Sequence, residues 1–336
     1  VNATTILADH IIVATGSRPA TLPGFEIDGS VVVTSREAIV DDRIPERAII
    51  IGGGSIGVEF AYVYNSYGTD VTIVELESNL LPREDEDVSR ALARELTKTG
   101  IHILTKSRVQ ALDVQDGTAI VDVASEAGST KLCADRVLVA VGITPNTDGL
   151  RAEEAGARLN HGFIQVDDDL CANDDSLYAV GDVNGRLPLA HTAQAEGVFA
   201  AEHIAGLRPQ RLDYLSMPRA TYCNPQVASI GLTEAQARAG GTEVRVGKFP
   251  FLANGRALAM GQSEGFVKIV ADAASGELLG AHFLGHEVTE LVGELSIARL
   301  LDGTDIELGN VVNAHPSMSE AVKEAALSAN GRAIHL

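Results

Sequence analysis

Residues 48–57 read AIIIGGGSIG, an apolar run followed by a glycine-rich turn. The turn fits the spacing G-x-G-x-x-G, which is typical of a loop that joins a strand to a helix and binds a dinucleotide. Three glycines in six residues are a weak signal alone. Here apolar residues lead into the turn, an apolar-faced helix from about Ser55 to Tyr67 leads out, and a strand at Val71 to Glu75 follows. The pattern predicts a βαβ unit that binds a dinucleotide.

Each of the three motif glycines has its own physical reason. Gly52 permits the tight turn, Gly54 lets backbone N–H groups approach a pyrophosphate at the helix N-terminus, and Gly57 lets helix and strand pack closely. Gly53, Ser55 and Ile56 complete the predicted loop. We expect all six residues to contact the nucleotide.

Glu75 ends the second strand, eighteen residues after Gly57, which is near the spacing expected for a ribose-binding acid. Its carboxylate can accept hydrogen bonds from both adenosine ribose hydroxyls. A 2′-phosphate would instead meet this carboxylate, with Glu77 close behind. NAD is therefore favoured over NADP, although a strand-end carboxylate can also be merely solvated.

The remaining periodicity indicates an α/β chain of several domains. A helix is expected at about Asp87 to Thr99, followed by strands and an Asp116-Gly117 hairpin turn. The expected domains are a first domain in two pieces, 1–40 and 144–211, a dinucleotide-binding domain at 41–143, and a separate α+β domain at 212–336. Helices are expected at 192–204, 288–301 and 317–328, and strands at 6–13, 48–51, 101–104, 109–114, 118–123, 136–141, 162–166, 177–180, 226–231, 242–249, 266–271 and 278–284.

Composition excludes several classes of function. The formal net charge of −20 repels nucleic-acid phosphates and anionic lipid, so neither is an expected partner. No apolar run approaches the ~18 residues of a membrane span, and the first residues do not resemble a signal peptide. We expect a cytoplasmic protein.

Cys133, Cys171 and Cys223 are far apart and form no C-x-x-C or C-x4-C pair. Neither a disulfide framework nor a metal cluster is indicated, and no metal site is expected.

Four motifs occur in a recognisable order: ATGSRP at 14–19, GGGSIGVE at 52–59, VGITPN at 141–146 and YAVGDV at 178–183. In this order the chain resembles the pyridine nucleotide-disulfide oxidoreductase family over essentially its whole length. The resemblance implies a flavoprotein homodimer in which a Rossmann-like NAD domain interrupts an FAD domain, here truncated, and a C-terminal α+β dimerisation domain follows.

The resemblance also implies further site residues. Thr15, Gly16 and Ser17 would lie near FAD, Asp182 would bind its ribityl chain, and Leu189, Ala190 and His191 would follow the flavin ring. Glu59, Val109 and Gly142 would join the NAD pocket.

The last motif, NAHPSMSE at 313–320, is similar to the His-Pro-x-x-x-Glu signature of dihydrolipoamide dehydrogenases. Pro316 disfavours a helical His315 and suits a first helical position, which would place Glu320 in the first turn to orient the imidazole. A histidine beside a helix start can also be structural. The resemblance implies catalytic roles for His315 and Glu320 and oxidation of protein-bound dihydrolipoamide, with electrons passing from dithiol to disulfide, FAD and NAD. The partner would be the lipoyl-bearing protein of a 2-oxo acid dehydrogenase complex.

Two alternatives remain open: a glutathione-reductase-like enzyme and a non-catalytic fragment. Glutathione reductases share the His–Glu ending but usually hold NADPH with arginines, whereas this chain has Glu75. Mercuric reductases fit less well, because they carry a C-terminal cysteine pair that is absent here. The family's first G-x-G-x-x-G and its redox-active C-x4-C pair do not precede Ala14. We therefore expect the chain as printed to be inactive alone, and a non-catalytic NAD-binding and dimerisation fragment is the second hypothesis.

Overall fold

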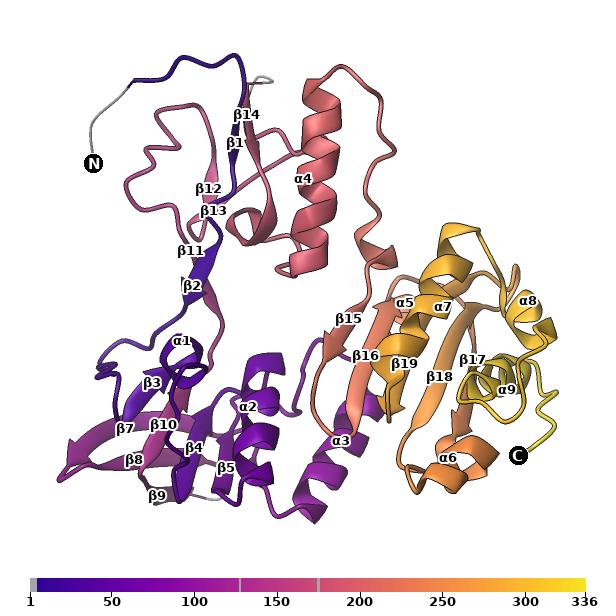
Figure 1. The fold of residues 1–336 in the computed structure, drawn as a ribbon, viewed down its shortest axis with the longest axis horizontal. Helices are drawn as coiled ribbons and strands as arrows, with labels where there is room; N and C mark the ends of the chain where they lie inside the picture. The colour runs from indigo at the N-terminus through magenta and orange to yellow at the C-terminus, as the bar shows by residue number, and fades with distance from the viewer. Residues whose placement is uncertain (1–4, 127, 174–175) are drawn as a thin grey trace. The chain divides into compact units, whose positions relative to one another are not determined.

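The computed structural model describes residues 5–126, 128–173 and 176–336 (Figure 1). The chain divides into two compact units. The first unit is Val1–Ala20 with Ile143–Tyr214, and the second unit is Thr21–Gly142 with Leu215–Leu336.

The second unit contains a five-stranded parallel sheet in the order β3-β10-β4-β5-β6. Its strands are β3 Val32–Thr34, β4 Arg47–Ile51, β5 Asp70–Val74, β6 His102–Leu104 and β10 Arg136–Val139. The apolar run of β4 is buried along its last four residues, as expected for a parallel strand covered on both faces. This strand carries the glycine turn at its carboxyl end, near the middle of the sheet.

Three helices accompany this sheet: α1 Ser35–Ala38, α2 Ser55–Ser66 and α3 Glu86–Lys98. Helix α3 begins where Asp85 accepts a hydrogen bond from the Asp87 N–H. Val88, Leu92 and Leu96 lie on its buried face, at the spacing of one helical stripe.

An antiparallel meander covers part of the same core. It consists of β7 Arg108–Gln115, β8 Thr118–Ser125 and β9 Gly128–Ala134. Asp116 and Gly117 join β7 to β8 with φ angles of 49° and 77°, as a two-residue turn of this type requires. Strand β9 was not expected from the sequence.

The segment before β4 differs from the expected domain limits. Residues 21–40 were assigned to the first domain, but Val32–Thr34 pairs in parallel with β10 and so lies in the nucleotide-binding sheet. This strand has only three residues, all buried, and its partner lies about a hundred positions later, so the local sequence pattern does not show the pairing.

The rest of the second unit is built on an antiparallel sheet in the order β15-β16-β19-β18-β17. Its strands are β15 Arg219–Thr221, β16 Gln226–Gly231, β17 Val244–Pro250, β18 Phe266–Asp272 and β19 Leu278–Gly285, and its helices are α5 Glu234–Ala239, α6 Gly255–Met260, α7 Val288–Leu300, α8 Asp305–Asn310 and α9 Glu320–Ala329. The 3-10 turn η3 Phe251–Ala253 follows β17, and η2 Tyr214–Ser216 begins with the last residue of the first unit. Helix α9 packs so closely on β17 that a Cβ on Gly247 would lie 1.9 Å from the Ala325 carbonyl oxygen.

The two sheets of the second unit share a junction at α3. Leu92 and Val88 belong to one apolar cluster with Val227, Phe266 and Leu284 of the antiparallel sheet. Beside this cluster, the nearly buried Nζ of Lys268 in β18 lies 2.8 Å from Asp85, 3.0 Å from Asp87 and 2.9 Å from Glu234.

The first unit is smaller. Strand β1 Ile11–Val13 runs parallel to β14 Leu177–Ala179, and β2 Ser17–Pro19 pairs antiparallel with β11 Ile143–Pro145. A short ladder of β12 Leu159–Asn160 and β13 Phe163–Ile164, the 3-10 turn η1 Gly181–Asn184 and helix α4 Ala190–Ile204 complete it. The strand expected from residue 6 begins only at Ile11.

Two general features concern the described residues only. No helix among them combines the length and apolar character needed to cross a membrane. In the same ranges, no group of three or more His, Cys, Asp or Glu side chains is arranged to hold a metal ion, and no disulfide joins the three cysteines.

Candidate functional site

The glycine turn after β4 has the geometry of an anion site. Gly52 has a φ of 108°, and a Cβ there would lie 2.3 Å from the Ala140 carbonyl oxygen. A Cβ on Gly57 would lie 1.9 Å from the Gly52 carbonyl oxygen, so α2 can pack on the turn only with glycine at this position. A Cβ on Gly54, by contrast, would meet no neighbouring atom within 4 Å. Gly54 is the N-cap of α2, and no side chain caps this helix with a hydrogen bond.

This combination leaves room beside the N-terminal N–H groups of a twelve-residue helix. A pyrophosphate fits such a place because the helix dipole and its unbonded N–H groups both favour negative charge. The residues present therefore fit NAD, and the binding roles of the six loop residues stay predictions.

Glu75 follows β5 and is bound to this loop. Its side chain accepts hydrogen bonds from the N–H of Gly53 and, at 2.7 Å, from the N–H of Glu77. The residue is 7% exposed, whereas Glu77 is exposed. A carboxylate has about four acceptor positions, so two remain for ribose hydroxyls. Sequence reasoning missed the contact with Gly53, where a Cβ would come within 3.1 Å of Glu75 Oε2.

Three further NAD candidates lie outside the loop of residues 52–57, although Gly142 follows Ala140 and Val141, which border Gly52. Glu59 on α2 accepts a hydrogen bond from the Tyr222 N–H at 2.8 Å, and burial raises the pKa of Glu59. Val109 is half-buried in β7 and packs on the core beneath the meander. Gly142 is exposed, with a φ of 119°. The side-chain hydrogen bonds of Glu75 go to Gly53 and Glu77 and not to any of these three residues.

In the first unit, three of the sequence motifs meet. The Asn146 N–H donates to the Gly16 carbonyl oxygen at 3.0 Å, and the Asn146 side chain donates to the Thr15 carbonyl oxygen at 3.0 Å. The Ser17 hydroxyl donates to Asp182 Oδ2 at 2.5 Å. Residues 165 positions apart are thus brought together beside the end of β14.

Asp182 lies in η1, which contacts the start of α4. Leu189 caps α4 in an extended conformation without a side-chain hydrogen bond, and Ala190 and His191 form the first helical positions. The half-buried carboxylate of Asp182 offers acceptors for hydroxyl groups. The start of α4 has no side-chain cap, so its backbone N–H groups offer donors for a carbonyl oxygen. These residues fit the ribityl chain and ring of FAD, and their roles stay predictions.

His315 and Glu320 form a pair at the start of α9. His315 Nδ1 lies 2.9 Å from Glu320 Oε1, and the Ser317 N–H donates to Glu320 Oε2 at 2.9 Å. The Ser317 N–H and, after it, His315 hold the pKa of the Glu320 carboxyl below its usual value. Because Nδ1 faces an ionised carboxylate, it carries the proton of the neutral ring and leaves the Nε2 lone pair for solvent or substrate.

The expected place of Pro316 is wrong. Helix α9 begins at Glu320, so Pro316 precedes it in a turn and is not the first helical residue. The carbonyl oxygens of Ser317 and Ser319 accept side-chain hydrogen bonds from Asn254 and Asn313, at 3.0 and 3.1 Å. These bonds tie the approach to α9 to other parts of the chain; Ser319 caps the helix with φ −59° and ψ −23°, and Glu320 still falls in the first turn.

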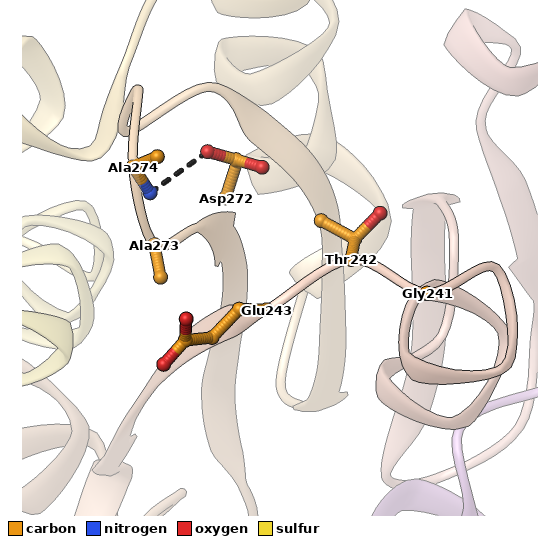
Figure 2. Close-up of a pocket in the computed structure, with 6 residues that line it drawn as sticks. All are labelled: Gly241, Thr242, Glu243, Asp272, Ala273 and Ala274. Atoms are coloured by element: carbon orange, nitrogen blue, oxygen red, sulfur yellow. Dashed lines mark hydrogen bonds between the residues drawn. The ribbon is translucent and has the colours of Figure 1, made fainter.

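A separate cavity of about 490 Å³ lies at one end of the antiparallel sheet, between the segment that precedes β17 and the end of β18 with the turn after it (Figure 2). Asp272 in this cavity uses one carboxylate oxygen to accept from the Ala274 N–H at 2.9 Å. None of the candidate site residues lines the cavity, which consists of turn residues 241–243 and 272–274.

Comparison with known proteins identifies similar sequences. A model described as pyridine nucleotide-disulphide oxidoreductase matches residues 1–197, and one described as the dimerisation domain of the same class matches residues 217–326. The chain is 40% identical to dihydrolipoyl dehydrogenase of Bacillus subtilis over 98% of its own length and 70% of that protein. It is 46% identical to dihydrolipoyl dehydrogenase of Mycobacterium leprae over 94% of its length and 68% of that protein.

Solved structures give the same picture. LpdA of Mycobacterium tuberculosis superposes with a TM-score of 0.88 at 29% identity, covering 95% of this chain and 69% of that one. The HOCl-induced flavoprotein disulfide reductase RclA of Escherichia coli superposes with a TM-score of 0.85 at 29% identity, covering 94% of this chain and 73% of that one.

Proposed function

Since the chain belongs to the pyridine nucleotide-disulphide oxidoreductase family, we propose that it acts in the NAD-linked oxidation of protein-bound dihydrolipoamide to lipoamide. Its cofactors are FAD and NAD, and its class is an oxidoreductase that acts on a sulfur group. The expected α/β fold, with a nucleotide-binding sheet and a C-terminal dimerisation domain, is confirmed.

One observation carries the assignment of thiol–disulfide chemistry: the His315–Glu320 pair, in which the carboxylate contacts Nδ1 of an exposed imidazole. The choice of dihydrolipoamide over glutathione rests on Glu75 and on the relatives. The nucleophile in thiol–disulfide exchange is a thiolate, and a free thiol with a pKa near 8.5 is mostly protonated at neutral pH. His315 Nε2 accepts the thiol proton of the substrate, and the resulting imidazolium is stabilised by the Glu320 carboxylate.

When bound, FAD would supply the two-electron redox chemistry at the sulfur centre, and NAD would supply the hydride acceptor. The chain's own residues bind and orient these groups. Asp182, Ser17 and the start of α4 hold the ribityl and ring side of FAD. The glycine turn holds the pyrophosphate of NAD, and Glu75 holds its ribose.

The match to a dimerisation domain supports a homodimer. His315 is 79% exposed at its side chain, so it is accessible to a reacting group outside its own domain. Several large apolar side chains of the same domain are also exposed, which a second copy would cover. They are Ile297, Leu300, Leu301, Ile306 and Val312.

We further propose that the partner is a lipoyl-bearing protein of a 2-oxo acid dehydrogenase complex. A cytoplasmic location stays a prediction of the sequence. The glutathione-reductase alternative is less well supported, because Glu75 occupies the place where an NADPH-binding arginine would be expected and the relatives described above are dihydrolipoyl dehydrogenases.

The test is His315→Gln in the intact gene product, with dihydrolipoamide-dependent formation of NADH followed by absorbance. Turnover should fall about 10²- to 10⁴-fold, as expected when a positioned base is lost, while NAD affinity and flavin content stay the same. His335→Gln is a matched control, because His335 Nδ1 is held at 2.8 Å by Glu324 on the same helix. Equal turnover of both variants would remove His315 from the mechanism, whereas no turnover in wild-type protein that has bound FAD would favour a non-catalytic module.

A further inference from the structure

We propose that Glu196 is a positioning residue for FAD, whose buried carboxylate fixes the η1 turn so that Asp182 faces the ribityl chain. This inference rests on the proposed function, because it takes Asp182 as an FAD ligand. Glu196 matches none of the residues for which the sequence predicted a role.

Glu196 lies within α4 and is completely buried. Its Oε2 accepts hydrogen bonds from the Gly181 N–H at 2.5 Å and from the Asn184 side chain at 2.9 Å. Its Oε1 accepts from the Tyr214 hydroxyl at 2.7 Å. One carboxylate therefore satisfies donors from three positions, two of which are the first and last residues of η1.

These bonds determine how η1 leaves the sheet. The Val180 N–H still pairs with the Val13 carbonyl oxygen, as in a regular strand. At Gly181 the φ is 75°, which turns the N–H inward, and a Cβ there would lie 3.1 Å from Ala193 Cβ on α4. Without an acceptor inside, this N–H would be buried and unsatisfied, so the turn would favour another conformation.

The far end of η1 is held in the same way. Asn184 donates to Glu196 and to the Ala179 carbonyl oxygen, at 3.2 Å, and its side-chain oxygen accepts from the Arg186 N–H at 2.9 Å. Asp182 lies between these two anchors, and its known partner is the Ser17 hydroxyl. The carboxylate of Asp182 is therefore aimed by contacts that Glu196 makes on both sides of it.

Tyr214 fixes the opposite oxygen of Glu196. Burial and then the adjacent Glu196 raise the pKa of the Tyr214 hydroxyl, so it remains a donor throughout the neutral range. The Arg186 guanidinium lies 5.2 Å from the centre of the Tyr214 ring, and it also donates to the carbonyl oxygens of Val166 and Asp167. The carboxylate is thus held in a single orientation.

The experiment compares FAD dissociation constants of the reconstituted intact protein, measured by quenching of flavin fluorescence, for Glu196→Ala, Glu196→Gln and Glu202→Ala. Loss of the carboxylate acceptor should weaken FAD binding by about 10- to 100-fold in Glu196→Ala. Glu196→Gln should stay within about 3-fold of wild type, because the amide oxygen can accept from Gly181 and Asn184 while the amide N–H donates to Tyr214. Glu202→Ala is the matched control, an exposed acid on the same helix.

Two further readouts separate positioning from general damage. The visible circular dichroism of the bound flavin should change in Glu196→Ala and be restored in Glu196→Gln. NAD affinity should be unchanged, because the glycine turn belongs to the second unit. Wild-type FAD affinity in Glu196→Ala, or equal weakening in Glu196→Gln, would overturn the proposal.

If Glu196→Ala yields no folded protein, Tyr214→Phe decides, since it removes one donor alone. It should weaken FAD by about 3- to 10-fold, and an unchanged dissociation constant would overturn the proposal. Asp182→Ala separates this inference from its premise: if that variant binds FAD normally, the assigned FAD site fails, whereas normal binding in Glu196→Ala alone leaves the site intact and removes only the positioning role.

Discussion

Replacing Glu75 by alanine should weaken NAD⁺ binding by about 10- to 100-fold and reduce the preference over NADP⁺. The carboxylate accepts hydrogen bonds from the N–H groups of Gly53 and Glu77. These two bonds orient the carboxylate, and its remaining acceptor positions are the ones proposed for the ribose hydroxyls. A hydrogen bond to a charged group contributes about 1.5–3 kcal/mol, so losing one bond from a ribose hydroxyl corresponds to roughly 10- to 150-fold in the dissociation constant.

Calorimetric titration of NAD⁺ and NADP⁺ into wild type, Glu75→Ala, Glu75→Gln and Glu77→Ala measures this directly. Glu75→Gln should be intermediate, because an amide has one acceptor oxygen and cannot serve both N–H groups. Glu77→Ala should bind NAD⁺ as wild type does. Tighter binding of NADP⁺ by wild type, or an unchanged preference in Glu75→Ala, would refute the reasoning.

Other predictions concern stability and the glycine turn. Lys268→Met should lower the free energy of unfolding in urea by about 3–5 kcal/mol, because it leaves the buried carboxylate of Asp85 without its cation. Lys248→Met is the control, because Lys248 pairs with Lys268 across β17 and β18 but its side chain is 44% exposed; it should cost less than about 1 kcal/mol. Burial raises the pKa of Asp87, but the hydrogen bonds from Lys268 and Arg90 together with the nearby lysine charges lower it to about 2. The stabilisation from ionised Asp87 is therefore complete above the ordinary value of 3.8 and is lost as pH falls toward 2. A urea midpoint that is flat across this window in wild type would contradict this. Gly54→Ala should keep wild-type stability, measured by thermal unfolding, yet weaken NAD⁺ binding, measured by titration. Gly57→Val should lower both the stability and the NAD⁺ affinity, because its side chain would clash with the Gly52 carbonyl oxygen.

The βαβ unit could be predicted because its signals are local. The apolar run of β4, the glycines and Glu75 lie within 28 consecutive residues, from Ala48 to Glu75. The His315–Glu320 pair was also visible, since five positions separate the two side chains. The start of α9 could not be predicted in this way, because it depends on Asn254 and Asn313, whose side-chain amides donate to carbonyl oxygens just before the helix.

Features that depend on distant partners escaped prediction. Strand β9 is mostly exposed, so it shows no alternation of apolar residues. The role of Glu196 is hidden because an acid in a helix is usually solvated, and its donors Gly181 and Tyr214 lie 15 and 18 positions away. The junction at Lys268 joins residues more than 180 positions apart.

The most direct test of the account is the rate at which the intact protein reduces NAD⁺ with dihydrolipoamide, compared with NADP⁺ as acceptor and with NADPH-dependent reduction of oxidised glutathione. The Glu75 environment and the His315–Glu320 pair predict rapid dihydrolipoamide-dependent formation of NADH, slow reaction with NADP⁺ and negligible glutathione reduction. Faster NADPH-dependent reduction of glutathione, or no NADH formation from dihydrolipoamide in protein that has bound FAD, would contradict it.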